Sequence, residues 1–420
     1  MKKMKRCAIL VGGGPAPGIN SVISAATIKL RNEGISVVGI MDGFQHLMKG
    51  DTAQIRELAI DDVAHIHLDG GTILRTSRAN PTKKEEDLKT VVDAFNTLKV
   101  DAVITIGGDD TCFSAIQLEK KAKGKIQFVH VPKTIDNDLD LPHGIRTFGF
   151  TTAWDFGAKI TQSIIADAQS TNRWYFITAM GRKAGHLALG IGKSTGATLT
   201  IIPEEFGDVK EISLQHVVDI LMGAVIKRKS LGREYGVAIL AEGLAERLSE
   251  YELKKMGKIE YDEHGHIRLA EIDLGGILKD EVTAGLKEFG IKETIVDKDI
   301  GYELRSVAPT AFDIEYTRDL GYSAAVYLLN GNSGDMISIQ GGVAVPIPFT
   351  SAIDPQTGRT RVRLVDPDTQ SYHVALEYMI RLKKVDFENK DDLEKLAKIA
   401  KITPEAFVKR FGYLVGMGGK

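Results

Sequence analysis

The sequence predicts an α/β fold of two Rossmann-like lobes, each built on a mainly parallel sheet flanked by helices. Short apolar runs rich in β-branched residues alternate with helical periodicity over residues 1–140. The same alternation resumes after residue 173. Several runs end in glycine-rich or charged turns, which is typical of strands that pass into helices. Because ligands bind beyond the carboxyl ends of the strands in such sheets, we expect the active site in a cleft at those ends.

The composition is that of a globular protein. The chain has 420 residues, of which 43% are apolar and 26% charged, enough for one or two packed domains. Its net charge of −2 provides no basic field for nucleic acid. The apolar run after the basic start is too short for a secretory signal, and no stretch reaches the ~18–20 apolar residues of a membrane-spanning helix. We therefore expect a cytoplasmic protein with no nucleic-acid or membrane partner, in which Cys7 and Cys112 are buried and free.

The first lobe begins with a strand predicted over residues 8–11, which a turn of glycines and prolines follows at 12–18. Backbone N–H groups at a strand-to-helix turn favour phosphate. The spacing matches neither the dinucleotide fingerprint nor the Walker loop, so a plain tight turn is an equally good interpretation. Further elements are predicted as helices at 21–32 and 83–98 and strands at 34–40, 102–106 and 126–131.

A loop at 70–78 carries Arg75 and Arg78 among glycine, serine and threonine residues. Guanidinium groups in such a loop bind phosphate in a forked geometry, so both arginines can face one anion. A solvated loop is the alternative.

The central motif is Gly-Gly-Asp-Asp-Thr at 107–111, directly after a predicted strand. Adjacent carboxylates repel phosphate unless a divalent cation comes with it, and Mg²⁺ bridges carboxylates to phosphates in this way. A second turn, Pro-Lys-Thr-Ile-Asp-Asn-Asp at 132–138, follows the next strand. Four carboxylates and one lysine at neighbouring strand ends indicate phosphoryl transfer, with a metal, a base and a cation. An Asx-rich turn without function is the structural alternative for 136–138 alone.

The second lobe repeats the alternation. Met-Gly-Arg at 180–182 follows one predicted strand, and Glu242 follows another, where ligand groups collect. Residues 248–268 are interpreted as a charged surface excursion. The elements are predicted as strands at 174–179, 197–202 and 236–241, helices at 151–168, 213–228, 272–289 and 318–329, a strand that ends within 300–305, a hairpin at 336–348, and two charged helices over 391–411.

These motifs resemble those of the phosphofructokinases, and in particular of the short pyrophosphate-dependent ones. The matching stretches are GGDD at 107–110, PKTIDND at 132–138, MGR at 180–182, EG at 242–243 and YELR at 302–305. The resemblance covers about residues 7–380. It implies reversible transfer of a phosphoryl group from pyrophosphate to the 1-hydroxyl of fructose 6-phosphate, with Mg²⁺ as cofactor and a homodimer or homotetramer as the assembly.

The resemblance also implies a role for individual residues. Asp136 resembles the base that takes the proton of the sugar hydroxyl, and Lys133 and Asp110 complete the catalytic set. Asp109 resembles a Mg²⁺ ligand, with Asp138 as a second. The residues that match donor-binding and sugar-binding positions are Gly12, Arg78, Thr134, Ile135, Asp136, Arg173, Met180, Gly181, Arg182, Glu242, Tyr302, Glu303, Leu304 and Arg305.

The resemblance has two further implications, one at Arg173 and one at Val296. Arg173 matches an arginine that reaches the sugar phosphate of a neighbouring subunit. One position departs from the family pattern, because an arginine is often found six residues before Tyr302, where this chain has Val296.

The donor is predicted from two positions. ATP-using relatives carry glycine where this chain has Asp110 and Lys133. The carboxylate of Asp110 occupies the space of an α-phosphate and repels it, whereas Lys133 neutralises the smaller, charge-dense pyrophosphate. The alternatives are an ATP-dependent 6-phosphofructokinase and a non-catalytic, sugar-phosphate-sensing subunit. A lipid or NAD kinase is a weaker alternative, because these kinases lack the motifs at 132–138 and 180–182.

The resemblance divides the chain into three segments. Residues 1–140 are expected to form a larger lobe with the phosphate-donor and Mg²⁺ sites, and residues 141–310 a second lobe with the sugar-phosphate site. Residues 311–420 are expected to return to the lobes and to end in terminal helices.

Overall fold

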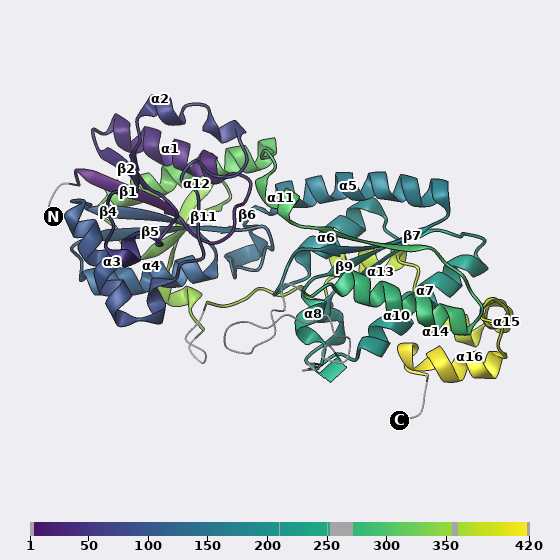
Figure 1. The fold of residues 1–420 in the computed structure, drawn as a ribbon. Helices are drawn as coiled ribbons and strands as arrows, with labels where there is room; N and C mark the ends of the chain where they lie inside the picture. Colours follow the sequence, from purple (N-terminus) through teal and green to yellow (C-terminus); the bar gives the residue numbers. More distant parts are fainter. Residues whose placement is uncertain (1–3, 210, 250, 253–271, 355–359, 418–420) are drawn as a thin grey trace. The chain divides into compact units, whose positions relative to one another are not determined.

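A computed structural model describes residues 4–209, 211–249, 251–252, 272–354 and 360–417 (Figure 1). The chain divides into two compact units, and neither is continuous in sequence. The first contains Met1–Phe156 and Tyr302–Arg363, and the second contains Gly157–Gly301 and Leu364–Lys420. The chain leaves the first unit after Phe156 and returns to it at Tyr302. The predicted boundary at residue 140 therefore lies before the first of these points, and the predicted boundary at residue 310 lies after the second.

The first unit is built on a sheet with the order β12-β11-β5-β4-β1-β2-β3. Its interior pairs run parallel, and the edge strands β3 and β12 run antiparallel to their neighbours. The strands are β1 (Arg6–Val11), β2 (Ser36–Ile40), β3 (Ile55–Glu57), β4 (Ala102–Gly107), β5 (Gln127–Thr134), β6 (Phe148–Gly149), β11 (Asp335–Gln340) and β12 (Val343–Pro348).

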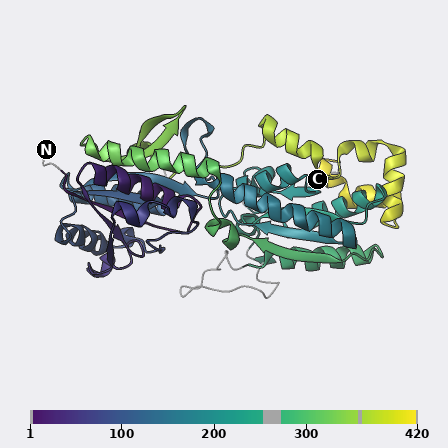
Figure 2. The same cartoon turned by 90° about the horizontal axis from the view of Figure 1, so that it is seen from above.

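Helices cover both faces of this sheet, as the alternation of elements predicts. On one face α1 (Ile19–Asn32) packs along α12 (Ala311–Leu329), although nearly 300 residues separate them in sequence (Figures 1 and 2). On the other face lie α3 (Glu85–Thr97) and α4 (Asp109–Ala122). The first unit also contains the short helices α2 (Ile60–Val63) and α11 (Tyr302–Ser306) and the first two turns of α5 (Phe150–Thr171).

The second unit is built on a sheet with the order β10-β7-β9-β8, in which each neighbouring pair is parallel. Its strands are β7 (Trp174–Ala179), β8 (Leu199–Ile201), β9 (Gly236–Ala241) and β10 (Ile295–Ile300). Its helices include α6 (His186–Thr195), α7 (Leu214–Ser230), α8 (Leu244–Arg247), α10 (Leu274–Glu288), α13 (Gln370–Tyr378), α14 (Lys384–Glu388), α15 (Lys390–Ile399) and α16 (Pro404–Phe411).

The C-terminal helices belong to the core of the second unit. Phe387, Phe407 and Phe411 are buried with the apolar side chains of α7 and α10. The carboxylate of Asp219 on α7 is 1% exposed and accepts hydrogen bonds from Arg410 and from the hydroxyl of Tyr413, the latter at 2.7 Å. Polar and apolar contacts together therefore fix the end of the chain to α7.

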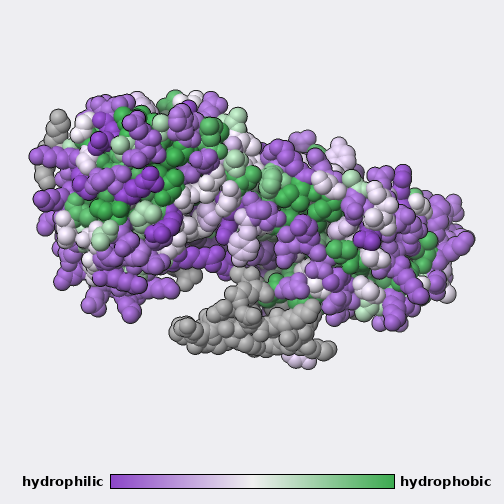
Figure 3. All heavy atoms as spheres, turned by 45° about the horizontal axis from the view of Figure 1, so that its top comes forward, coloured by the Kyte–Doolittle hydropathy of each residue, from purple (hydrophilic) through white to green (hydrophobic). Residues whose placement is uncertain are grey.

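The surface is mainly polar. Figure 3 shows hydrophobic patches that polar side chains interrupt on the face drawn. In the described part of the chain, no helix combines the length and apolar character needed to cross a bilayer. Cys7 and Cys112 are both buried and free, as predicted.

Two local predictions differ from the structure, and one short strand was missed. Strand β5 does not end before the second motif but continues to Thr134, because β6 pairs with Lys133 and Thr134. The YELR stretch is the helix α11, which follows β10 after Gly301. The short strand β3 was not predicted. Most of the predicted surface excursion at 248–268 lies outside the described residues.

Candidate active site

The glycine turn after β1 is packed against the start of α4. The N–H of Gly12 donates to the carbonyl of Ile106 at 2.9 Å, and the N–H of Gly13 donates to the carbonyl of Ser77 at 2.9 Å. A Cβ atom on Gly12 would lie 2.4 Å from the Oγ1 of Thr111. Only glycine therefore lets the turn lie this close to the helix that carries the Asp109–Asp110 pair.

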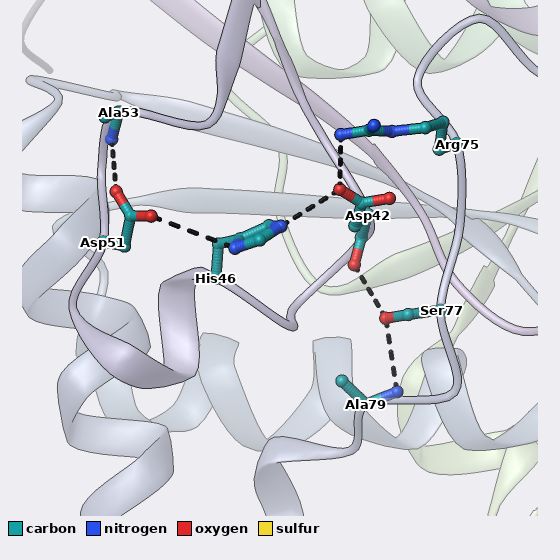
Figure 4. Close-up of polar contacts among 7 residues, drawn as sticks. All are labelled: Asp42, His46, Asp51, Ala53, Arg75, Ser77 and Ala79. Atoms are coloured by element: carbon teal, nitrogen blue, oxygen red, sulfur yellow. Dashed lines mark hydrogen bonds and ion pairs between the residues drawn. The ribbon is translucent and has the colours of Figure 1, made fainter.

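The loop that carries Arg78 is fixed by a polar network around Asp42 (Figure 4). The carboxylate of Asp42 accepts a hydrogen bond from Arg75 at 2.6 Å and lies 3.0 Å from the Nε2 of His46. The hydroxyl of Ser77 donates to the backbone carbonyl of Asp42 at 2.7 Å. Arg75 is thus an ion-pair partner of Asp42, whereas Arg78 on the same loop is exposed.

The two acidic residues of the GGDDT motif form the first turn of α4. The N–H of Asp110 donates to the Oδ1 of Asp109 at 2.9 Å. Negative charge at a helix N-terminus is stabilised by the helix dipole, so both carboxylates are compatible with this helix. Asp110 is exposed, and Asp109 is partly buried.

Lys133 links the second motif to the glycine turn. Its side chain is buried, and its Nζ donates to the carbonyl oxygen of Gly14 at 2.5 Å. Burial lowers the pKa of Lys133 to about 8, which the carboxylate of Asp136 opposes and the guanidinium of Arg305 reinforces. The negative charges of Asp138 and Asp109 also raise the pKa of Lys133 and so oppose the effect of burial. The lysine therefore lies within electrostatic range of three of the four predicted carboxylates.

The turn after β5 carries Asp136 and Asp138. Residues 134, 136 and 138 are partly buried, whereas 135, 137 and 139 are buried, so partly accessible residues alternate with buried ones along this segment. The N–H of Asp136 donates to the Oγ1 of Thr134 at 3.0 Å. Asn137 has a left-handed backbone, with φ at 56°, and its Oδ1 accepts from the N–H of Thr147 at 3.1 Å. This conformation interrupts the extended backbone between the two aspartates.

The residues of α11 contribute a second cation to the first unit. The guanidinium of Arg305 lies 4.8 Å from the ring centroid of Tyr302, which is 75% exposed. A Cβ atom on Gly14 would lie 3.0 Å from the Nη1 of Arg305, so this side chain also reaches the glycine turn. Glu303 is exposed and Leu304 is fully buried.

The second unit brings together the residues that resemble a sugar-phosphate site. The N–H of Gly181, whose φ is 139°, donates to the Oε2 of Glu242 at 3.1 Å. The Nε of Arg182 donates to Glu246 at 3.0 Å. Burial raises the pKa of Glu242, which the N–H of Gly181 and the charge of Arg182 oppose. Met180 is joined to the end of β10, because its N–H donates to the carbonyl of Ile300 at 3.0 Å.

The remaining predicted positions of this unit lie at the ends of its strands or on them. Arg173 is exposed and directly precedes β7. Val296 and Lys298 both lie on β10, two residues apart, so they share one face of that strand. Lys298 is exposed and Val296 is partly buried.

Sequence reasoning missed His130, which lies inside β5. Its Nδ1 is 2.8 Å from the Oγ1 of Thr105, and its Nε2 is 3.1 Å from the carbonyl oxygen of Gly107. Burial lowers the pKa of His130 to about 3, so the ring is neutral near pH 7. A carbonyl can only accept, so Nε2 carries the proton and Thr105 donates to Nδ1. A histidine inside an apolar strand was the available signal.

Sequence reasoning also missed Arg363, which no motif indicated. Its side chain donates three hydrogen bonds, two to Asn137 and one to the carbonyl of Ile145 at 2.7 Å. It therefore contacts the residue between Asp136 and Asp138.

The carboxylates of the first unit fit Mg²⁺ that arrives with a phosphate ligand. Asp109 and Asp138 are oxygen donors within electrostatic range of the same lysine. Among the residues that the structure describes, no group of three or more acidic, histidine or cysteine side chains is arranged to hold a metal alone. Mg²⁺ commonly takes one or two carboxylates and completes its shell with water and phosphate oxygens, so a carboxylate pair is a suitable protein contribution.

Comparisons with known proteins agree on one family. The family model described as phosphofructokinase matches residues 6–328. A pyrophosphate–fructose 6-phosphate 1-phosphotransferase of Naegleria fowleri is 49% identical over 99% of this chain and 97% of its own. One of Thermotoga maritima is 52% identical over 97% of this chain and 98% of its own. The crystal structure of a pyrophosphate-dependent phosphofructokinase from Marinobacter aquaeolei shares the fold, with a TM-score of 0.65 at 17% identity over 94% of this chain and 92% of that one.

Proposed function

This chain belongs to the phosphofructokinase family, and on that premise we propose that it transfers a phosphoryl group reversibly from pyrophosphate to the 1-hydroxyl of fructose 6-phosphate. The products are fructose 1,6-bisphosphate and phosphate. The proposal rests mainly on the buried Lys133. Its ammonium group donates a hydrogen bond to the glycine turn and interacts electrostatically with Asp109, Asp136 and Asp138. Such an arrangement combines a cation for phosphate with carboxylates for proton transfer.

Asp136 acts as the general base in the proposed reaction. It takes the proton of the 1-hydroxyl, the sugar oxygen attacks one phosphorus of pyrophosphate, and the bridging P–O bond breaks to release phosphate. The ammonium group of Lys133 stabilises the negative charge of the transferring group. Arg305, which also reaches the glycine turn, adds a second positive charge.

Asp109 and Asp138 would hold Mg²⁺ together with the pyrophosphate oxygens. Bound there, the cation neutralises phosphate charge and orients the two reacting groups. Of the two carboxylates, Asp109 is the preferred Mg²⁺ ligand, because it is the first residue of α4 and follows the Gly107–Gly108 turn directly.

Asp110 and Lys133 decide the phosphoryl donor. Asp110 is exposed in the first turn of α4, where its carboxylate opposes the additional phosphate of a nucleotide. Two unit charges about 4 Å apart interact by about 4 kcal/mol at an effective dielectric near 20. A difference of about 1.4 kcal/mol is already tenfold in affinity, so this repulsion is sufficient to reverse a donor preference.

The second unit supplies the sugar-phosphate site. Met180, Gly181, Arg182 and Glu242 are proposed to bind fructose 6-phosphate, and their mutual contacts support a preformed loop. Arg173, exposed before β7, is proposed to reach the sugar phosphate of a neighbouring subunit. The assembly is then a homodimer or homotetramer, and the enzyme works in the cytoplasm on glycolytic substrates.

The donor comparison tests this function. Initial rates with fructose 6-phosphate and Mg²⁺ are measured in parallel with pyrophosphate, ATP and polyphosphate. We expect the rate with pyrophosphate to exceed that with ATP by at least about a hundredfold, which corresponds to about 2.7 kcal/mol. Equal or higher rates with ATP would assign the chain to the ATP-dependent type, and no rate with any donor would favour a sensing subunit.

The variant Asp110→Gly isolates the donor argument. We expect its ratio of ATP rate to pyrophosphate rate to rise at least tenfold, because both the volume and the charge of the carboxylate are removed. Asp87→Gly is the matched control, because Asp87 also lies in the first turn of a helix, α3. An unchanged ratio in Asp110→Gly would contradict the role of this carboxylate.

A further inference from the structure

Arg363 holds the turn between the two aspartates from a distant part of the sequence. Its Nε donates to the carbonyl of Asn137 at 3.1 Å, and its Nη2 donates to the Oδ1 of the same residue at 2.5 Å. Its Nη1 donates to the carbonyl of Ile145 at 2.7 Å. These bonds join residue 363 to both ends of the loop that follows β5.

The backbone of Arg363 adds a second attachment. Its N–H donates to the carbonyl of Asp138 at 2.7 Å, and Val362 forms an antiparallel bridge with Leu139. The guanidinium is partly buried, and burial lowers its pKa, which the carboxylates of Asp140 and Asp138 oppose. The charge of Arg363 is therefore balanced by the acidic side of the same turn.

The conformation of Asn137 makes this attachment consequential. Its left-handed backbone, with φ at 56°, is a conformation that asparagine adopts more readily than most residues other than glycine, and hydrogen bonds to its side chain help to hold it. Its side-chain oxygen accepts from Arg363 and from the N–H of Thr147. If Asn137 relaxed to a negative φ, the path of the backbone between Asp136 and Asp138 would change, and the two carboxylates would be displaced.

We propose that Arg363 is a positioning residue, which fixes Asp136 in the orientation that proton transfer requires. The inference rests on the proposed function for the identity of Asp136 as base, and on the hydrogen bonds of Arg363 for the holding of the turn. Arg363 touches Asn137, Asp138 and Ile145, so it acts through the turn and not on the substrate. A positioning error of this kind lowers turnover much more than substrate affinity.

The test compares Arg363→Ala, Arg363→Lys and the control Arg361→Gln in the full chain. Arg361 is an exposed arginine two residues away. With fructose 6-phosphate and Mg-pyrophosphate, we expect kcat to fall 10- to 100-fold in Arg363→Ala while both KM values stay within threefold. Arg363→Lys, whose ammonium cannot reach three acceptors in a planar fork, should be intermediate. Guanidinium at low millimolar concentration should restore several-fold activity to Arg363→Ala, and Arg361→Gln should match the native chain.

Amide hydrogen exchange supplies a readout that does not depend on the reaction. We expect the peptide covering residues 134–147 to exchange at least tenfold faster in Arg363→Ala, and in Arg361→Gln to exchange at the native rate. Unchanged exchange would overturn the proposal even if the native enzyme used another substrate. Faster exchange with kcat within twofold of native would also overturn it, because the turn would then be held without consequence for the base. A native chain inactive with every donor would count against the proposed function alone.

Discussion

The Nζ of Lys133 lies 2.5 Å from the carbonyl oxygen of Gly14, so a buried cation at the end of β5 is joined to the glycine turn after β1. The two segments are 119 residues apart. Their contact brings two separate sequence motifs together in the first unit, where we propose that they bind phosphate.

A pH dependence of donor use is expected from the burial of this lysine. The pKa of Lys133 is lowered to about 8, so the ammonium is charged below pH 8 and loses its charge above it. Because the charged form is proposed to neutralise pyrophosphate, kcat/KM for pyrophosphate should fall as the pH rises through about 8. In Lys133→Arg the charge persists at every accessible pH, so this fall should be absent. Profiles of kcat/KM against pH for the two enzymes test the point, and two identical profiles would contradict it.

Replacement of Asp136 should abolish proton transfer and leave donor binding intact. General-base catalysis contributes typically about 10²- to 10⁴-fold, so we expect a loss of turnover of that size in Asp136→Ala. Pyrophosphate affinity, measured by titration calorimetry with Mg²⁺, should change by less than about threefold, which is below 1 kcal/mol. Near-normal turnover would exclude Asp136 as the base.

Gly12 should not tolerate a side chain, because its Cβ would lie 2.4 Å from the Oγ1 of Thr111. Overpacking of this kind costs about 1–3 kcal/mol, and Gly12→Ala should lower the free energy of unfolding by that amount. The double variant Gly12→Ala/Thr111→Ala should be less destabilised than the sum of its single changes.

Gly108→Ala is the control for this experiment. A Cβ on Gly108 would lie 3.5 Å from the carbonyl oxygen of Lys133, and its φ of −84° suits any residue. Urea unfolding should therefore show a smaller loss for Gly108→Ala than for Gly12→Ala. Equal losses of unfolding free energy in the two variants would contradict the tighter packing expected around Gly12.

Asp219 should anchor the C-terminal helices of the second unit. Its buried carboxylate accepts from Arg410, Tyr413 and Gln215. Hydrogen bonds to a charged group contribute about 1.5–3 kcal/mol, so Asp219→Asn should lower the free energy of unfolding of this unit by about that amount. Glu394→Gln removes an exposed pair with Lys390 and should cost less than about 1 kcal/mol. Equal losses in the two variants would contradict the anchoring role.

Much of the fold could be predicted from local patterns. The apolar runs that became β1, β4, β7 and β9 are buried along nearly their whole length, which is why their composition identified them. The extension of β5 to Thr134 could not be predicted in this way, because its last two residues pair with β6, which has two residues and no periodicity. Pro132 is also a poor indicator of a strand interior.

The parts of the candidate site that could be predicted are those whose residues lie next to one another in the sequence. Asp109 and Asp110 open α4 because glycines and an apolar strand precede them, and this order is visible in the sequence. Arg363 was not predictable, because its partner Asn137 is 226 residues away and its own neighbourhood has no distinctive composition. His130 was not predictable either. Its hydrogen bond to the carbonyl of Gly107 joins two strands, so it depends on the register of β4 and β5.

The discontinuity of the first unit determines the order in which it can assemble during synthesis. Strand β11 pairs with β5 through Asp335↔Val129 and Met336↔His130, and it carries β12 at the edge of the sheet. A nascent chain therefore exposes one side of β5 until more than 200 later residues have left the ribosome, and contacts of such high sequence separation slow folding. The second unit likewise lacks its α14–α16 helices until the end of translation. One edge of the first sheet therefore stays without its partner strand while residues 135–334 are made, which is close to half of the 420-residue chain.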